Sequence, residues 1–222
     1  MFLVRHGETT VAAEDRFAGS SDVALAASGR LQAERLSSRL ASERIYAAYC
    51  SPMQRTRETA AIVVRPHGCT LAERDGLREV GHGHWEGLRR TEVEQRFPDE
   101  YAAWAEDPFT FAPQGGESGV QVVARALPVI REIVLAHVNE NVLVVSHKAI
   151  IRLIIASLLG FDARGYRDHL DQQPASLNVL DFTSLVRVRL VLFNDVSYYA
   201  SVPPRSTRRL SKWFDPASPT AM

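Results

Sequence analysis

The sequence has few cysteines and no excess of charge of either sign. Its two cysteines, Cys50 and Cys69, form neither a CxxC pair nor a disulfide framework. We therefore expect a reducing compartment, with both thiols acting as small buried hydrophobic groups. Lys and Arg number 26, as do Asp and Glu, so the basic excess of a nucleic-acid or anionic-membrane binder is missing. An anionic ligand must be bound by a local cluster of cations.

A long apolar run is also lacking. Residues 1–4 are apolar, but Arg5 follows at once, whereas a signal peptide needs a longer apolar stretch and a membrane span needs about 20 residues. We expect a cytoplasmic protein that contacts no membrane. The 222 residues, 45% of them hydrophobic, suffice for one large domain, or one domain with a small cap, without disulfides or structural metal.

Short apolar segments alternate with amphipathic ones, which predicts an α/β fold. The run Val142–Val145 is continuously apolar, as is typical of a central parallel strand buried on both faces. We expect a three-layer α-β-α fold around a mainly parallel sheet. Leu31, Leu36 and Leu40 should share the buried stripe of the first helix. The predicted strands are 1–4, 45–50, 69–71, 141–146, 177–182 and 186–193, and the predicted helices begin near residues 28, 51, 118 and 149.

Local signals predict where several helices begin and end. The Ser-x-x-Gln sequences at Ser51–Gln54 and Ser118–Gln121 predict capping boxes, the first with proline at the first helical position. Pro128 should kink or split the helix that contains it. Gly160 should end the helix that starts at residue 149.

Two segments differ from the rest in composition. Residues 74–117 contain two of the three tryptophans with many charges, prolines and glycines, and we expect a cap of loops and short helices inserted into a domain of residues 1–202. Residues 203–222 are rich in Pro and Ser and are basic. This composition is typical of a solvated, partly disordered tail.

Four candidate functional side chains follow the ends of predicted strands or open a helix. Arg5 and His6 follow the first strand, Arg55 lies in the first turn of a helix, and His147 follows the central strand. Because ligands of such sheets bind at the carboxyl ends of the strands, we expect these side chains to meet there. Arginine side chains match phosphate oxygens well, and Gly7 would let backbone N–H groups approach an anion. A phosphate dianion is the expected ligand.

The same cations bear on the reactivity of the histidines. Neighbouring guanidinium groups should lower the imidazole pKa values from the ordinary value of about 6.5. An unprotonated imidazole is a nucleophile and a protonated one is not. The predicted cluster would therefore bind a phosphate and keep the attacking nitrogen free.

Five segments, in order and spanning residues 1 to about 155, resemble the histidine phosphatase superfamily, also called the phosphoglycerate mutase-like family. The order of all five is far more specific than any one tripeptide. The segments are Arg5–Thr9, Ser51–Ala60, Leu77–Gly87, Gly115–Ser118 and Val144–His147.

The resemblance implies roles for the candidate residues. His6 would take the phosphoryl group as phosphohistidine, and the phosphoryl oxygens would be held by Arg5, Arg55 and His147. No metal and no cofactor is implied, because these residues supply the positive charge themselves.

The resemblance also implies a general acid. Glu79 would protonate the leaving oxygen and then activate the hydrolytic water, whereas Glu86 would be structural. His82 and His84 have the spacing of two metal ligands, but a third or fourth ligand for zinc is not evident in the sequence. His82 is instead expected at the substrate entrance.

Substrate contacts beyond the reacting group are less defined. We expect them from Gly7, Thr9, Gly19, His82 and Lys148. Lys148 stands where most family members have Gly, and it would either pair with a second acidic group of the substrate or point into solvent. Val11–Ala12 stand where many members have Trp-Asn. These differences leave the chemistry intact and the substrate open.

We expect a metal-independent phosphomonoesterase that hydrolyses a small phosphorylated metabolite, such as phosphoserine or phosphoglycerate, as a monomer or homodimer. One alternative is a cofactor-dependent phosphoglycerate mutase, whose cap is typically longer. Another is a non-catalytic phosphate-ester binder, which would be expected to lack the nucleophile or the acid; both are present here.

Overall fold

The computed structural model describes residues 1–10 and 16–200, and their strands form one sheet in the order β3-β2-β4-β1-β5-β6. β1 to β4 run parallel to one another, while β5 is antiparallel to β1 and β6 to β5. The mainly parallel sheet predicted from the sequence is confirmed. The strands are β1 Phe2–Arg5, β2 Ala47–Cys50, β3 Thr70–Glu73, β4 Val142–Ser146, β5 Leu177–Ser184 and β6 Arg187–Asp195.

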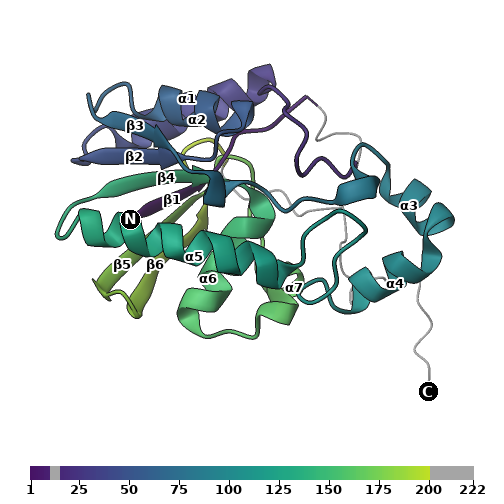
Figure 1. Ribbon diagram of the computed structural model, residues 1–222. Helices are drawn as coiled ribbons and strands as arrows, with labels where there is room; N and C mark the ends of the chain where they lie inside the picture. Colours follow the sequence, from purple (N-terminus) through teal and green to yellow (C-terminus); the bar gives the residue numbers. More distant parts are fainter. Residues whose placement is uncertain (11–15, 201–222) are drawn as a thin grey trace.

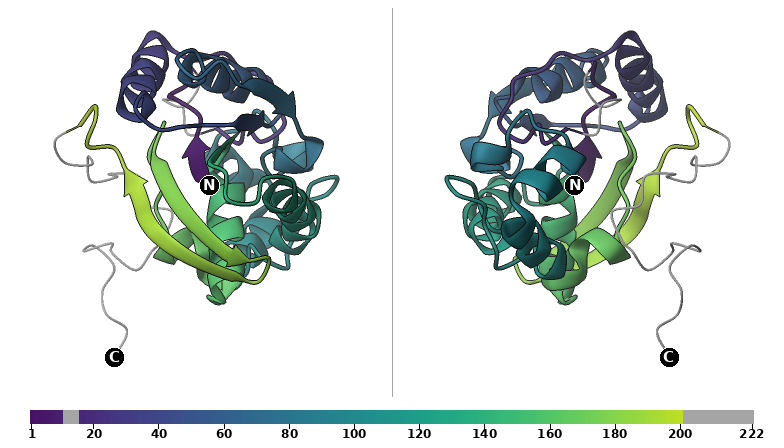
Figure 2. Two further views of the ribbon diagram at one scale, coloured as in Figure 1. Left: turned by 90° about the vertical axis from the view of Figure 1, so that its left-hand side faces the viewer. Right: turned by 90° about the vertical axis from the view of Figure 1, so that its right-hand side faces the viewer.

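Helices cover both faces of this sheet (Figures 1 and 2). Phe2 and Val4 pack in one core with α1 and α2, whereas Leu3 packs in the other with α5 and α6, because successive side chains of a strand point to opposite faces. All five residues of β4 are buried. The three-layer prediction is therefore confirmed. The helices are α1 Ala27–Leu40, α2 Gln54–Val63, α3 Arg90–Arg96, α4 Pro98–Glu106, α5 Gly119–Ala136, α6 Lys148–Leu159 and α7 Tyr166–His169, with 3-10 turns η2 Asp75–Leu77, η3 Gly83–Trp85 and η4 Ala163–Gly165.

α3 and α4 lie away from the sheet, at the right of Figure 1. They share a small aromatic core with η3 and with Phe17, which comes from the segment before α1. Phe17 and Trp104 contact each other edge to face at 5.4 Å between ring centroids. This second core holds the short helices in place, and none of the described residues of α3 or α4 belongs to the core clusters on the sheet.

Two expectations for the helices are wrong. α2 begins at Gln54, and its N-cap, Met53, makes no side-chain capping bond, so the capping box predicted at Ser51 is absent. The Ser51 hydroxyl instead bonds to the His147 ring. Leu31 is 52% exposed, because α1 buries the stripe formed by Gly29, Ala33, Leu36 and Leu40.

Pro128 lies inside α5 without splitting it. Proline removes the N–H that would bond to the carbonyl of residue 124, but both Ala124 and Pro128 are exposed. Water can therefore satisfy that carbonyl, and the helix continues. The capping box at Ser118 and the left-handed Gly160 that ends α6 are both confirmed.

The remaining expectations concern the cysteines, two segments outside the described residues, and membrane-spanning helices. Cys50 is buried as predicted, whereas Cys69 is half-buried. Val11–Ala12 and the tail from residue 203 lie outside the described residues. Within the described part of the chain, no helix is long and apolar enough to span a membrane.

Candidate active site

The ends of β1, β2 and β4 bring the predicted residues to one edge of the sheet. His6 donates its backbone N–H to the Ser146 carbonyl at 3.0 Å, and Ser51 donates its own to Val145 at 3.1 Å. The rings of His6 and His147 consequently meet edge to face, with centroids 5.2 Å apart. The convergence at the carboxyl edge predicted for parallel strands is present.

His6 is held in the tautomer that a nucleophile needs. Its Nδ1 lies 2.7 Å from the Gly7 carbonyl oxygen; since a carbonyl only accepts, Nδ1 carries the proton. Nε2 is then unprotonated, and it has no hydrogen-bond partner among the described residues. Burial, followed by the charges of Arg5 and Arg55, holds the pKa of His6 well below its ordinary value. The ring is therefore neutral at physiological pH.

His147 is fully buried behind His6 and binds protein groups on both ring nitrogens. Its Nδ1 accepts from Arg55 Nε at 3.1 Å, so Nε2 carries the proton and donates to the Ser51 hydroxyl at 2.9 Å. Burial and then Arg55 hold its pKa well below the ordinary value. To reach a phosphoryl oxygen, as the sequence predicts, Nε2–H would have to exchange Ser51 for that oxygen.

The two arginines have N–H groups left over for an anion. Arg55 donates Nη1 to the Ser21 carbonyl at 2.7 Å and Nη2 to Gly19 at 3.0 Å, which leaves one N–H on each terminal nitrogen. Arg5 donates Nη1 to the Gln172 carbonyl at 2.6 Å, while its buried Nε has no partner among the described residues. Burial, reinforced by Arg152, lowers the pKa of Arg5 to about 10.

A cavity of about 330 Å³ opens in front of His6. All the predicted site residues line it except Gly7 and His147; those that do are Arg5, His6, Thr9, Gly19, Arg55, Glu79, His82 and Lys148. The N–H of Gly7 donates to the Thr59 hydroxyl at 3.1 Å, so it is not available to an anion here. Gly7 serves packing instead, because a Cβ there would overlap the Gly29 carbonyl of α1.

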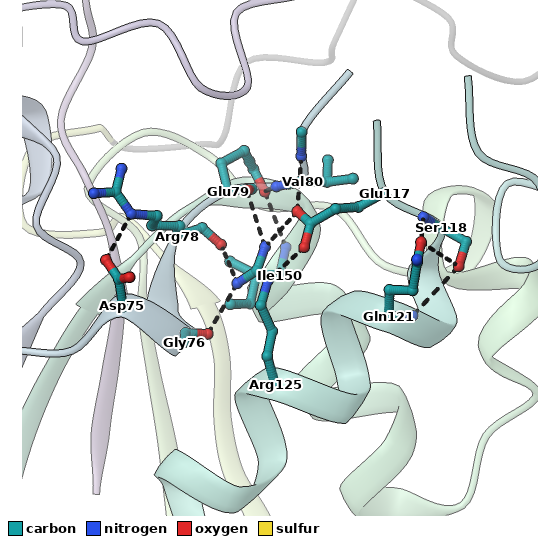
Figure 3. Close-up of polar contacts among 11 residues, drawn as sticks. Asp75, Gly76, Arg78, Glu79, Val80, Glu117, Ser118, Gln121, Arg125 and Ile150 are labelled. Atoms are coloured by element: carbon teal, nitrogen blue, oxygen red, sulfur yellow. Dashed lines mark hydrogen bonds and ion pairs between the residues drawn. The ribbon is translucent and has the colours of Figure 1, made fainter. Parts of the chain in front are cut away.

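The carboxylate of Glu79 lies at the N-terminus of α6. It accepts the backbone N–H groups of Val80 at 3.1 Å and of Ile150 at 3.2 Å (Figure 3). It also accepts the N–H of Ala149 at 3.2 Å. Glu86, the other candidate acid, accepts the N–H groups of Ser20 and His82 and so ties two loops together. Of the two, only Glu79 lines the cavity that holds His6.

The two histidines with metal-ligand spacing point to different neighbours. His82 lines the cavity with its ring against Phe17, 4.8 Å between centroids, and burial lowers its pKa although Glu86 opposes this. His84 stacks on Phe97 and bonds to Glu100 at 2.9 Å. In the described ranges, 1–10 and 16–200, no group of three or more His, Cys, Asp or Glu could hold a metal ion.

Several cavity residues were missed by sequence reasoning. Arg152 lies one turn after Lys148 in α6, and both approach Asp171 Oδ1, at 3.1 and 3.5 Å. Burial, then Arg152 and Arg5, lowers the pKa of Lys148 to about 8. Lys148 and Arg152 are four residues apart in a predicted helix, so the sequence could have placed both on the same helix face. Arg167, which lies 4.0 Å above the Trp104 ring, gives no comparable signal.

The comparisons with known proteins agree with this geometry. Residues 1–196 match the model of the histidine phosphatase superfamily (branch 1). Phosphoserine phosphatase 1 of Hydrogenobacter thermophilus is 33% identical over 73% of this chain and 77% of its own length. A glucosyl-3-phosphoglycerate phosphatase of Mycolicibacterium vanbaalenii is 32% identical over 72% of this chain and 74% of its own.

A solved structure extends the likeness to three dimensions. The protein YhfR of Bacillus stearothermophilus superimposes with a TM-score of 0.84 at 30% identity, over 89% of this chain and 97% of that one. Motif order, the edge-of-sheet cavity and both kinds of comparison agree. The chain therefore belongs to the histidine phosphatase superfamily and is a phosphatase.

Proposed function

We propose that this chain hydrolyses phosphate monoesters of a small metabolite through a phosphohistidine at His6, without a metal ion. The observation that carries the proposal is the unprotonated Nε2 of a neutral, buried imidazole at a cavity lined by arginines. A nucleophile of this kind needs no general base, because it has no proton to lose.

In the first step, His6 Nε2 attacks phosphorus and the bond from phosphorus to the ester oxygen breaks. Glu79 donates a proton to that leaving oxygen. The free N–H groups of Arg5 and Arg55 stabilise the charge on the transferring group. The bond from His6 Nδ1 to the Gly7 carbonyl fixes the ring and favours the positive charge that the ring gains.

In the second step, the Glu79 carboxylate takes a proton from water as the water oxygen attacks phosphorus. The bond between phosphorus and Nε2 breaks, inorganic phosphate leaves, and His6 returns to its neutral state. Glu79 is thereby protonated again and ready for the next ester. Each residue ends the cycle as it began.

Turnover of p-nitrophenyl phosphate in excess EDTA tests the reaction class. We expect full activity with EDTA and loss of at least 10³-fold in His6→Ala, since about this much is lost when a nucleophile is removed. Activity that EDTA abolishes and Zn²⁺ restores would refute metal independence.

A second experiment distinguishes a phosphatase from a phosphoglycerate mutase. When 2,3-bisphosphoglycerate is added with 3-phosphoglycerate, a mutase would make 2-phosphoglycerate, whereas a phosphatase would release inorganic phosphate.

Charge balance in the cavity points to the substrate class. Among the described residues, Arg5, Arg55 and Arg167 have no carboxylate within ion-pair distance, and Lys148 and Arg152 share Asp171. With Glu79 protonated, as the first step requires, these groups sum to four positive charges. A phosphate monoester dianion neutralises two of them, so we propose a phosphorylated carboxylic acid whose carboxylate lies near Lys148. Relatives named for phosphoserine and glucosyl-3-phosphoglycerate support this.

Pairs of substrates that differ by one carboxylate test the proposed preference for a phosphorylated carboxylic acid. 3-Phosphoglycerate and glycerol 3-phosphate differ by one carboxylate, as do phosphoserine and phosphoethanolamine. We expect kcat/KM to be at least tenfold higher for the carboxylated member of each pair, as about 1.4 kcal/mol of added interaction would give. Equal or inverted preference in both pairs would remove the carboxylate claim and leave the reaction class standing.

A further inference from the structure

We propose that Arg125 is a positioning residue for Glu79 and that Glu117 locks it in place. The inference rests on the proposed role of Glu79 as the general acid. It also gives a function to the Gly115–Ser118 segment, which belongs to the family-like pattern but contributes no side chain to the cavity at His6.

Arg125, from the middle of α5, binds the backbone of the loop that carries Glu79 (Figure 3). Its Nη1 donates to the carbonyls of Gly76 at 3.0 Å and Arg78 at 2.8 Å, and its Nη2 donates to the carbonyl of Glu79 itself at 3.0 Å. A single guanidinium group therefore fixes three carbonyls of one turn. Hydrogen bonds from a charged donor are stronger than those between neutral groups.

Glu117 completes the clamp from the other side. It accepts Arg125 Nε at 2.8 Å and Nη2 at 2.9 Å, a bidentate pair, and it also accepts the Gly81 N–H at 3.0 Å. Burial opposes the ionised form, but the bonds from Arg125 and Gly81 hold the pKa of Glu117 below its ordinary value. The charged pair thus binds the chain both before and after Glu79.

The glycines of the two segments make this approach possible. Glu117 donates its N–H to the Gly81 carbonyl at 2.8 Å, and His84 donates to the Gln114 carbonyl at 3.1 Å. A Cβ on Gly83 would overlap the Gln114 carbonyl, and one on Gly116 would lie 2.8 Å from the Gly81 oxygen. The two backbones are therefore packed directly against each other.

Arg125 acts at a distance from the reacting atoms. It does not line the cavity that holds His6 but a second cavity of about 440 Å³, which has Glu79 in its wall as well. Glu79 thus lies between the substrate side and the clamp side. Because proton transfer requires the acid within hydrogen-bond reach of the leaving oxygen, a small displacement of this loop would reduce catalysis.

The test compares p-nitrophenyl phosphate with phenyl phosphate. The first releases a stabilised anion that needs little protonation, whereas the second needs the acid. In Arg125→Ala we expect kcat/KM for phenyl phosphate to fall at least tenfold more than kcat/KM for p-nitrophenyl phosphate. We compare kcat/KM because it reports the first step, whereas kcat also contains the second step, which is common to both substrates. Arg131→Ala, an exposed position on the same helix, is the control and should leave the ratio of the two kcat/KM values unchanged.

Equal losses on both substrates in Arg125→Ala would overturn the proposal, because that is what a merely structural role produces. Glu117→Gln keeps the side-chain volume and weakens the lock, so it should shift the kcat/KM ratio in the same direction even if Arg125→Ala does not fold. An unchanged ratio in a folded Glu117→Gln would also overturn it. Methylguanidinium can enter the second cavity and should partly restore the ratio in Arg125→Ala; no restoration would count against guanidinium positioning.

Glu79→Gln separates this inference from the proposed function. It should shift the kcat/KM ratio at least as far as Arg125→Ala does. If Glu79→Gln leaves the ratio unchanged, the acid role of Glu79 fails. If Glu79→Gln shifts it and Arg125→Ala does not, the acid role stands and the clamp is wrong.

Discussion

At the scale of single residues, the contacts of each histidine decide what it can do. His6 and His147 have the same side chain, yet one is protonated on Nδ1 and the other on Nε2, because one faces a carbonyl and the other a guanidinium. The sequence places both beside cations but does not reveal which ring nitrogen each partner occupies. That assignment needs the three-dimensional structure.

The first prediction concerns the protonation of His6. Its lowered pKa means that the ring stays neutral on lowering the pH from 8 to 6.5. NMR titration of ¹⁵N-labelled imidazoles should show unprotonated Nε2 and protonated Nδ1 throughout this range. A His6 ring that is half protonated at or above pH 6.5, as in the urea-unfolded chain, would contradict it.

The second prediction concerns Lys148, whose pKa is lowered to about 8. The amine is charged below that pH and neutral above it, so its attraction for a carboxylate should weaken as the pH rises through 8. We expect kcat/KM for 3-phosphoglycerate to fall above pH 8 relative to that for glycerol 3-phosphate. Lys148→Met should remove this difference in pH dependence; if the variant retains it, another group is responsible.

At the scale of elements, two similar local sequences have different outcomes. Ser118–Gln121 forms the predicted capping box of α5, but Ser51–Gln54 caps nothing. The Ser51 hydroxyl is taken by His147, from a strand end 96 residues away. A local pattern predicts a helix start only where no distant partner competes for the same hydroxyl, and such partners are hidden in a linear reading.

This contrast gives the third prediction. Ser118→Ala should lower the free energy of unfolding by about 1 kcal/mol, the usual cost of losing a helix N-cap. Ser51→Ala should reduce kcat through the loss of a His147 contact, and it should also lower stability because it leaves a buried N–H of His147 without a partner. Urea unfolding and p-nitrophenyl phosphate turnover of both variants provide the check. A Ser51→Ala variant with unchanged kcat would contradict the assignment.

At the scale of the whole molecule, a chain of zero net charge places seven of its 26 Arg and Lys residues around one cavity, counted over the part of the chain that the structure describes. The strand segments and the three layers followed from apolar runs and alternation, whereas the strand order did not. Arg5 and Arg55 followed from their places at a strand end and a helix start, and Glu79 followed from the family resemblance. Arg152, one turn after Lys148 in α6, was missed although its spacing was a usable signal. Arg167 was hidden, because it reaches the cavity from α7, whose register only the fold defines. Arg125 was hidden for the same reason.

The fourth prediction is a pH dependence of global stability. His6 and His147 have lowered pKa values in the folded state, so the unfolded chain binds more protons than the folded one below about pH 6.5. Stability is therefore full above that pH and is lost progressively as the pH falls toward the folded-state values. The urea midpoint should be lower at pH 5.5 than at pH 7.5. A smaller difference is expected in His147→Gln, and an unchanged or larger one would contradict this origin.

The central claim is that a neutral imidazole at position 6 receives the phosphoryl group. Rapid quenching of the enzyme with ³²P-labelled p-nitrophenyl phosphate, whose leaving group needs little protonation, at alkaline pH, followed by peptide mass spectrometry, tests it most directly. The account predicts an acid-labile phosphoryl group on His6 that forms within one turnover and accumulates further when Glu79→Gln slows its hydrolysis. Label on any other residue, or label that persists in His6→Ala, would contradict it.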